Sequence, residues 1–434
     1  MFLYVGDAAR FNVSSRELPR FLPGKIHIVR NKNQCAIWIE DKFTKGWETA
    51  RELRIEVRRP GIDQEPLVRF LWLIARDEIV VERLWSGEFT AYLLRQPTWI
   101  LASHLRLAAW LCGGLPSGAR PLRPASRVRI RRGTLTEENT EVGRETRRNN
   151  GRFEYGKTVE FIRNSVFGSM KKSPFRSALL LSGGVDSSIV AAVGKMVGKQ
   201  LHPFVFGLKS LVRPQNREVD DFFYAKRMSD HLGFSLKTVR LDSRRLVANV
   251  PTAVALSETP RGTIIDDCVA LVEVAERLKR NGFSTVLMGE AADDLFGGFK
   301  FALRYYKGKD LQRYYLHELN VSLPNELCIL QKIFEPWGIS VIHPLWTLEL
   351  KQLAERLPLA VRVDRKRLMK RILRDAFGDI LPSEIRERPK GVTRDTTQIR
   401  FVLEGRFGKS RERYRGIFRK IFRDGFTWPR RRSN

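Results

Sequence analysis

The stretch Ala178–Val190, ALLLSGGVDSSIV, raises the main structural question in this sequence. Four apolar residues, which favour a buried strand, run into Ser182, two glycines and Asp186, and a helical pattern follows. One interpretation is an ordinary strand-to-helix turn in which an aspartate or a serine caps the helix. The other interpretation is a loop that binds a phosphate group.

The composition of this loop favours phosphate binding. Gly183 and Gly184 let the backbone approach an anion closely and adopt a positive φ where one is needed. The amide groups that open the next helix would face the anion, and the helix dipole favours that arrangement. Asp186 would repel a phosphate unless a cation lies between them, so the loop implies Mg²⁺. A Walker A loop is excluded because its GK[ST] ending is missing.

Strand-like and helical segments alternate after the polar, charged segment Thr134–Arg152, which is typical of a linker. The alternation predicts an α/β fold with a doubly wound parallel sheet, and short β-like runs before the linker predict a β-rich domain. We place domains at residues 1–150 and 151–400, and a basic C-terminal tail at residues 401–434. The expected strands after the linker are 178–181, 202–208, 236–241 and 285–288, and the expected helices are 158–170, 187–197, 220–233 and 267–281.

The composition indicates a folded, strongly basic protein. The 434 residues include 78 Lys and Arg against 48 Asp and Glu, which gives a formal net charge of +30, and 43% are hydrophobic. Such a charge attracts nucleic acid, anionic membranes or phosphorylated ligands. Four dispersed cysteines predict buried, reduced thiols. The start of the chain lacks signal-peptide features, and Phe70–Ala75 is far too short to span a membrane, so we expect a soluble, cytoplasmic protein.

Three motifs resemble one known family. LLLSGGVDSS is similar to the PP-loop of ATP pyrophosphatases, which cleave ATP to AMP and pyrophosphate. VLMGEAADDLFGGF (Val286–Phe299) resembles the VLSGEGADELFGGY segment of the asparagine synthetase family. LPSEIRERPKGV (Leu381–Val392) resembles that family's LP-xx-I-xx-RPK segment. The resemblance covers about Val159 to Thr393 and implies a PP-loop ATP pyrophosphatase fold.

The resemblance also implies roles for individual residues. Asp186 and Asp293 would share Mg²⁺, one carboxylate from each of two strand ends. Lys390 would neutralise charge on the α-phosphate, and Glu290 would assist proton removal from an attacking amine. The residues that would surround ATP are Leu181, Ser182, Gly183, Gly184, Asp186, Ser187, Ser188, Phe206 and Gly289.

The first domain resembles a degenerate glutaminase of the N-terminal-nucleophile (Ntn) hydrolase type. Ser86–Leu94 and Leu101–Leu111 are similar to two glutaminase segments. The chain begins Met1-Phe2-Leu3, whereas glutamine-dependent members begin Met-Cys, so we expect no glutaminase chemistry. β-Lactam synthetases and lasso-peptide cyclases are similar in layout, because each joins an inactive glutaminase domain to amide closure.

Departures from the family pattern bear on the substrate. The family's GVEARVPFLD is replaced by GISVIHPLWT (Gly338–Thr347), and Met288, Ala291 and Asp294 replace serine, glycine and glutamate. We expect an ATP- and Mg²⁺-dependent ligase that adenylates a small-molecule carboxylate and transfers the acyl group to ammonia or an amine. The alternatives are a PP-loop enzyme that acts on tRNA or another RNA through the basic surface, and a non-catalytic ATP-binding paralogue. No membrane partner is expected, and a homodimer is one candidate assembly.

Overall fold

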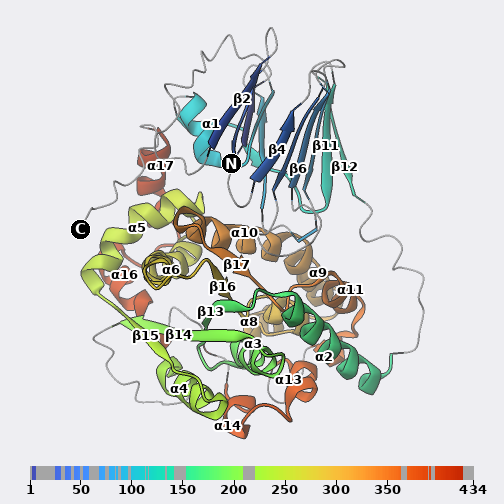
Figure 1. The fold of residues 1–434 in the computed structure, drawn as a ribbon, viewed down its shortest axis with the longest axis vertical. Helices are drawn as coiled ribbons and strands as arrows, with labels where there is room; N and C mark the ends of the chain where they lie inside the picture. Colours follow the sequence, from blue (N-terminus) through green and yellow to red (C-terminus); the bar gives the residue numbers. More distant parts are fainter. Residues whose placement is uncertain are drawn as a thin grey trace.

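The chain forms a β-rich N-terminal part and a larger α/β part, as the computed structural model shows (Figure 1). The structure describes residues 2–5, 25–30, 35–40, 44–48, 52–57, 68–73, 78–83, 85–86, 89–95, 99–112, 114–115, 117–131, 134–140, 153–208, 220–362, 369–389, 391 and 396–423. The N-terminal strands are β1 (Phe2–Val5), β2 (Lys25–Arg30), β3 (Cys35–Glu40), β4 (Thr44–Glu48), β5 (Glu52–Val57), β6 (Val68–Leu73), β7 (Glu78–Arg83), β8 (Tyr92–Arg95), β9 (Trp99–Ala102), β10 (Arg120–Pro121), β11 (Ser126–Arg131) and β12 (Thr134–Asn139).

The described N-terminal strands form two antiparallel sheets that pack face to face (Figure 1). One sheet has the order β10-β8-β9-β1-β3-β2, and the other has the order β12-β11-β7-β6-β5-β4. Trp38 and Leu101 of the first sheet share a core with Ile55 and Phe70 of the second. The predicted β-rich character of this part is therefore confirmed, while its likeness to a glutaminase stays a prediction.

The second part is built on a parallel sheet. Its described strands are β13 (Arg176–Leu180), β14 (Gln200–Leu208), β15 (Lys237–Leu241), β16 (Thr285–Leu287) and β17 (Ser340–Ile342), in the spatial order β15-β14-β13-β16-β17. All neighbouring pairs are parallel. The chain order reverses between β13 and β16, which makes this position the topological switch point, where open α/β sheets bind ligands.

Helices cover both faces of this sheet, so the predicted doubly wound fold is confirmed (Figure 1). Side chains alternate along β13, with Leu179 packed in the core on one face and Ala178 in the core on the other. The helices are α1 (Leu105–Cys112), α2 (Tyr155–Lys172), α3 (Val185–Met196), α4 (Asp221–Leu232), α5 (Ser243–Ser257), α6 (Gly262–Arg280), α7 (Ala292–Phe296), α8 (Lys300–Tyr305), α9 (Gly308–His317), η5 (Glu318–Ser322, π-helical), α10 (Leu323–Phe334), η6 (Glu335–Trp337, 3₁₀), α11 (Leu348–Arg356), α12 (Leu359–Arg362), α13 (Arg371–Phe377), α14 (Ser383–Arg386), α16 (Ile399–Phe407) and α17 (Arg415–Arg423).

The two parts meet across a buried cluster of charged side chains. His104 Nε2 donates to Glu335 Oε2 at 2.9 Å, and Arg106 lies 3.6 Å from Glu258 and 3.5 Å from Glu335. Lys332 pairs with Glu258 from the other side. Burial together with the charge of Arg106 lowers the pKa of His104 to about 4. Burial opposes ionisation of Glu258, but Lys332 and Arg106 outweigh it and lower the pKa of Glu258 to about 2.

The segments that composition predicted to be a linker and a basic tail both contain regular secondary structure. The segment expected to be a linker begins with strand β12, which pairs with β11, and only its later residues 141–152 lie outside the described residues. The basic segment at 401–434 contains most of α16 and all of α17, and Phe418 and Phe422 of α17 are buried in the core beside α5. The division at residues 150 and 400 stays a prediction.

Other expectations concern cysteines and membranes. Cys268 and Cys328 are buried free thiols, as expected, whereas Cys112 is a free thiol that is only half-buried. The side chain of Cys35 lies outside the description. Within the described ranges, every helix is too short or too polar to cross a membrane.

Candidate functional site

The switch point brings the sequence's two predicted magnesium ligands together. Asp186 lies in the first turn of α3, directly after β13, and Asp293 lies in the first turn of α7, directly after the neighbouring strand β16. Both carboxylates contact the Nζ atom of Lys370, which lies 2.5 Å from Asp186 Oδ2 and 2.9 Å from Asp293 Oδ1. The two carboxylates therefore reach the same cation.

The loop after β13 is not a turn in which a side chain caps the next helix, and the amide groups at the start of α3 are left open. The N-cap of α3 is Gly184, and no described side chain caps this helix. Asp186 is therefore not a cap. Helix α3 begins at Val185, two residues before the predicted start, so its first-turn amides lie within the loop. Uncapped amides and the positive end of the helix dipole suit a phosphate.

Hydroxyl groups hold the loop in shape. Ser182 Oγ accepts from the Gly184 amide at 3.2 Å and lies 3.2 Å from Ser187 Oγ. Ser187 Oγ also donates to the Gly184 carbonyl at 3.2 Å and accepts from the Ser182 amide at 3.3 Å. These bonds close the loop between Ser182 and Ser187. Ser182 and Ser187 therefore shape the loop in this structure.

Two positions must be glycine because neighbouring backbone passes too close to leave room for a side chain. Gly183 has φ of +71°, and an added Cβ would lie 2.5 Å from the Ala225 amide nitrogen of α4. Gly289, at the end of β16, would place a Cβ 2.6 Å from the Ser187 nitrogen and 2.8 Å from the Asp186 carbonyl carbon. Only glycine allows both approaches. Gly289 thus packs directly against the loop, and its place beside the adenosine stays a prediction.

Asp293 sits in an equally restricted turn. An added Cβ at Gly298 would lie 2.5 Å from the Asp293 Cγ, so the absence of a side chain at Gly298 makes room for the carboxylate. Ala291, which stands where the family has glycine, adopts the left-handed conformation with φ of 79°. An alanine pays about 1–2 kcal/mol there. The turn is thus held against local strain at the position that carries the acidic residues.

Lys370 is the residue that the sequence reasoning missed. Its side chain is 4% exposed, and its backbone adopts the left-handed conformation with φ of 59° at the start of α13. Burial disfavours the charged form, but Asp186 and Asp293 outweigh it and raise the pKa of Lys370. A lysine that lies 184 residues from its partner along the chain carries no local sequence signal. Its location could be read only from the fold.

Arg388 and Arg374 tie the C-terminal motif to the loop. Arg388 donates to the Ser182 carbonyl at 2.8 Å and to Asp221 Oδ1 at 2.7 Å, and its guanidinium lies 4.3 Å from the centre of the Tyr224 ring. Arg374 donates to the carbonyl of Arg388 at 3.2 Å. The RPK motif, read from sequence only for its lysine, therefore also supplies an arginine that anchors it. Lys390 itself lies outside the described residues.

The remaining predicted residues have different surroundings. Leu181 is buried and its amide donates to the Phe204 carbonyl at 2.8 Å, so it shapes the end of β13. Ser188 is fully buried, and its amide donates to the Gly184 carbonyl at 3.0 Å. Phe206 is half-buried on β14, and Glu290 is exposed after β16.

The segment that departs from the family pattern is buried against the N-terminal part. Trp346 donates from Nε1 to the Ser86 carbonyl at 3.0 Å, and its ring centre lies 5.3 Å from that of Trp85. His343 and Ser340 are almost fully buried. This segment therefore joins the two parts through Trp346, while Ser340, Ile342 and Thr347 stand where the family pattern has charged residues.

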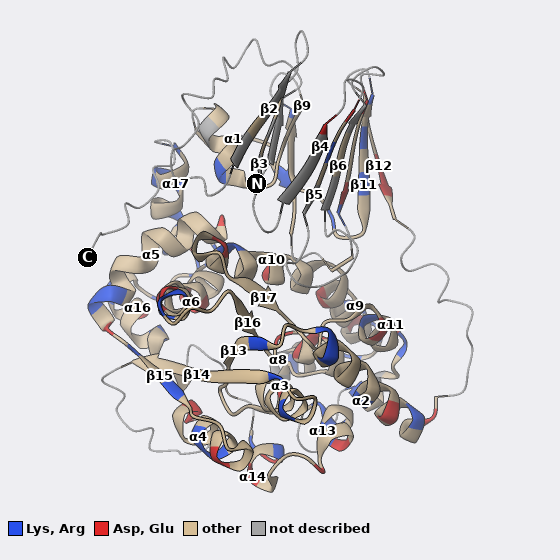
Figure 2. Cartoon of the chain, in the orientation of Figure 1, with Lys and Arg blue, Asp and Glu red and all other residues tan. Residues whose placement is uncertain are grey.

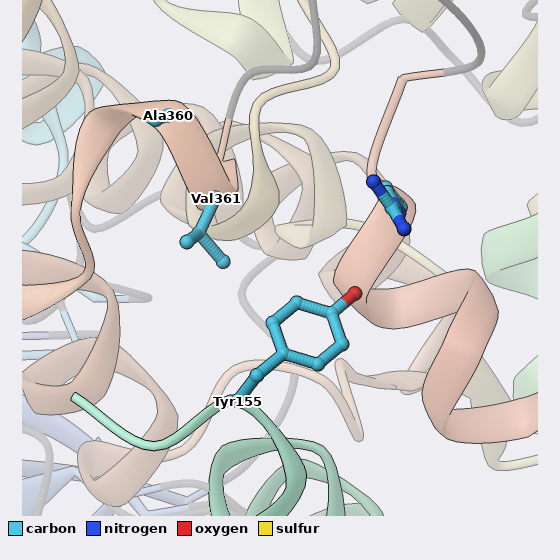
Figure 3. A pocket seen from close by; sticks show the side chains of 4 residues that line it. Tyr155, Ala360 and Val361 are labelled. Atoms are coloured by element: carbon cyan, nitrogen blue, oxygen red, sulfur yellow. The ribbon is translucent and has the colours of Figure 1, made fainter.

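A cavity of about 340 Å³ lies apart from these residues. Tyr155, Ala360, Val361 and Arg371 line it, and Figure 3 shows the Tyr155 ring beside Val361. The Tyr155 hydroxyl donates to Asp375 Oδ2 at 2.5 Å. None of the predicted site residues lines this cavity, so it does not define the site.

The donor set at the switch point suits a hard divalent cation. Carboxylate oxygens are preferred ligands of Mg²⁺, which commonly combines one or two of them with substrate phosphates and water. The space between Asp186 and Asp293 already accommodates a cationic group. Among the described residues, no group of three or more His, Cys, Asp or Glu could hold a metal alone. The residues present thus fit Mg²⁺ that arrives with a phosphate ligand.

Comparison with known proteins gives related sequences. Asparagine synthetase [glutamine-hydrolyzing] of Triphysaria versicolor is 27% identical over 238 residues, which are 51% of this chain and 39% of that protein. Asparagine synthetase B [glutamine-hydrolyzing] of Escherichia coli is 24% identical over 227 residues, 49% of this chain and 40% of that protein. The match thus spans about two fifths of the length of these curated relatives.

Among solved structures, an NH3-dependent NAD synthetase from Campylobacter jejuni in complex with nitrate is matched with a TM-score of 0.23 and 16% identity, over 38% of this chain and 75% of that one. An NMN synthetase from Francisella tularensis is matched with a TM-score of 0.29 and 12% identity, over 65% of this chain and 100% of that one.

The family comparison covers the whole of the site. The model of the family described as asparagine synthase matches residues 160–327 and 306–418, more than half of the chain. These ranges contain the loop after β13, the turn after β16, Lys370 and the segment around Arg388. With the parallel sheet and the two strand-end carboxylates at its switch point, the chain belongs to the asparagine synthase family.

Proposed function

We propose that the protein is an ATP- and Mg²⁺-dependent ligase that adenylates a carboxylate, releases pyrophosphate and transfers the acyl group to ammonia or an amine. The observation that carries this proposal is the pair Asp186 and Asp293, which reach one cation beside the uncapped start of α3. Family membership supports an ATP-dependent amide-forming reaction.

The proposed role of each residue follows from its position in the site. The first-turn amides of α3 and the left-handed Gly183 would bind phosphate oxygens. Asp186 and Asp293 would hold Mg²⁺, which supplies positive charge to the phosphates when bound. Gly289 and Phe206 would border the adenosine. Lys390 would offset negative charge at the α-phosphate, and Glu290 would accept a proton from the amine.

Pyrophosphate release from ATP tests the proposal directly. A panel of carboxylates is offered with ammonia or with an amine, and pyrophosphate is measured for the full chain. Asp186→Ala and Lys390→Ala should each abolish release, whereas Asp230→Ala, an exposed aspartate on α4 paired with Lys226, should not. Activity that survives the first two substitutions would contradict the site assignment. ATP binding without any release would favour a non-catalytic paralogue.

The nitrogen source is tested in the same assay. We expect product with ammonia or an amine but no hydrolysis of glutamine. Glutamine hydrolysis by the purified chain would contradict this part of the proposal.

RNA is a second candidate partner. Arg415, Arg419, Lys420 and Arg423 are exposed on α17, whose opposite face is buried, and Figure 2 shows basic residues along this helix. Phosphate neutralisation by such a surface drives salt-dependent binding. Binding of tRNA that weakens steeply with salt, and that is lost when Arg419 and Lys420 are replaced by glutamate, would support this candidate. No binding at low salt would remove it.

A further inference from the structure

The ammonium group of Lys370 fills the space between the two carboxylates proposed to hold Mg²⁺. Nζ lies 2.7 Å and 2.5 Å from the two carboxylate oxygens of Asp186 and 2.9 Å from Asp293 Oδ1. The three side chains come from three elements: α3, α7 and the residue before α13. The contact therefore joins both strand ends of the switch point to the C-terminal part of the domain.

The fold holds Lys370 there at a local cost. Its left-handed backbone is unfavourable for a residue with a side chain. Burying an ammonium group is also unfavourable unless it is paired. Arg374 Nε donates to the carbonyl of Met369 at 2.9 Å and so fixes the backbone on the N-terminal side of Lys370. The surrounding structure thus enforces a position that local preferences oppose.

The charges in this cluster explain what the lysine does to metal binding. Two carboxylates carry a charge of −2, which matches one divalent cation, but the ammonium leaves a charge of only −1. A free divalent ion must displace an ammonium group that is buried and paired with both carboxylates. An ion that arrives with a nucleotide brings phosphate oxygens, which are anionic partners for a displaced ammonium.

We propose that Lys370 is a resident cation that holds Asp186 and Asp293 together before the nucleotide binds and excludes Mg²⁺ that arrives without a nucleotide. Lys370 is then a positioning residue that makes metal binding conditional on phosphate. The inference rests on the proposed function, because it takes these carboxylates as the Mg²⁺ ligands.

Metal-dependent thermal stability of the full chain tests this idea without an activity measurement. In the absence of nucleotide, Mg²⁺ or Mn²⁺ should leave the unfolding temperature of the wild-type chain unchanged. Lys370→Gln should unfold at a lower temperature without metal and should recover by a few degrees when either ion is added. Lys370→Arg keeps the charge and should show no response to metal. Adding Asp186→Asn to Lys370→Gln should remove the recovery.

Lys351 provides a matched control. It is also buried, and it pairs with Glu355 at 2.5 Å and with Asn320 at 2.7 Å, away from the switch point. Lys351→Gln should lower the unfolding temperature but should not create a response to metal. A metal response in this variant would show that the effect is a general consequence of losing a buried lysine, and the proposal would fail.

Direct binding of Mn²⁺ to the wild-type chain, followed by electron paramagnetic resonance, removes the dependence on any variant. We expect binding at least tenfold tighter with ATP than without it. Equal binding with and without ATP, or a folded Lys370→Gln chain that ignores metal, would overturn the proposal. Failure of pyrophosphate release would instead contradict the proposed reaction, because neither stability nor Mn²⁺ binding requires turnover.

Discussion

Gly298 leaves no room for a side chain because the carboxylate of Asp293 occupies the place that a Cβ would take, 2.5 Å from the Asp293 Cγ. The glycine therefore fixes where a proposed metal ligand can lie, although it contributes no polar group. It stands in the GGF sequence that closes the turn after β16 and packs against α7.

Gly298→Ala should displace the Asp293 carboxylate. A displacement of about 1 Å in a group that positions the reacting atoms can lower the rate about 100-fold, and we expect a loss of that size in pyrophosphate release. Gly168→Ala is the control, because an added Cβ on α2 meets no atom within 4 Å. That change should keep activity and stabilise the helix by about 0.5–1 kcal/mol. Unchanged activity in Gly298→Ala would contradict a role for the Asp293 position.

Gly183→Ala should be more damaging than an ordinary substitution at a left-handed glycine. Its φ of +71° costs an alanine about 1–2 kcal/mol, and the Cβ would also collide with the backbone of α4, which adds about 1–3 kcal/mol. Gly198→Ala has a similar φ of +74° but open space, so it should show the first cost alone. Urea unfolding measures both. Equal losses of stability in Gly183→Ala and Gly198→Ala would show that the α4 backbone moves aside at little cost.

The buried pair His104 and Glu335 predicts a pH dependence. The pKa of His104 is about 4 in the folded protein, below its ordinary value of 6.5. The unfolded chain therefore takes up a proton between pH 6.5 and 4 that the folded chain does not, and stability falls as the pH falls through this window, by about 3 kcal/mol at its lower end. Glu258, with a pKa of about 2, contributes its own loss between about pH 4.5 and 2.

Unfolding followed between pH 7 and 4 separates these contributions. In His104→Gln, stability should fall less steeply as the pH is lowered from about 6.5, because the group that titrates there is gone. His317→Gln changes an exposed histidine and should leave the slope in place. A slope that survives His104→Gln would assign the acid sensitivity to other groups.

The sequence alone predicted those features of the fold that depend on residues close together in the chain. The alternation of strand-like and helical segments predicted the parallel sheet, and the glycine pair after Ser182 predicted a loop that can adopt the positive φ seen at Gly183. The resemblance to the asparagine synthetase family predicted that Asp186 and Asp293 act together from two strand ends, and in the structure both carboxylates contact Lys370.

Contacts between distant segments could not be predicted in this way. Lys370 and Arg374 lie in a charged stretch of a protein with a net charge of +30, where one more basic residue stands out in no pattern. Arg388 belongs to the RPK motif, but its contact with the Ser182 carbonyl could be read only from the fold. The basic composition of α17 likewise concealed Phe418 and Phe422, which bury one face of a helix read from sequence as part of a tail. Strand β12 was hidden by its polar composition, because its residues are mostly exposed.

Arg388 and Asp221 form a buried pair whose removal can be tested by a double-mutant cycle. Arg388 lies 2.7 Å from Asp221 Oδ1, and Thr396 donates to Oδ2 at 2.9 Å. Burial raises the pKa of Asp221 even though Arg388 opposes the shift.

Arg388→Met should lower the free energy of unfolding by about 3–5 kcal/mol, because it leaves an unpaired carboxylate in the interior. Arg388→Met combined with Asp221→Asn should recover part of that loss, because the charge that lacks a partner is gone. Urea unfolding of the four chains gives the coupling energy. Strict additivity would show that Arg388 acts through the Ser182 carbonyl and the Tyr224 ring instead, and the loss should then appear mainly in nucleotide binding.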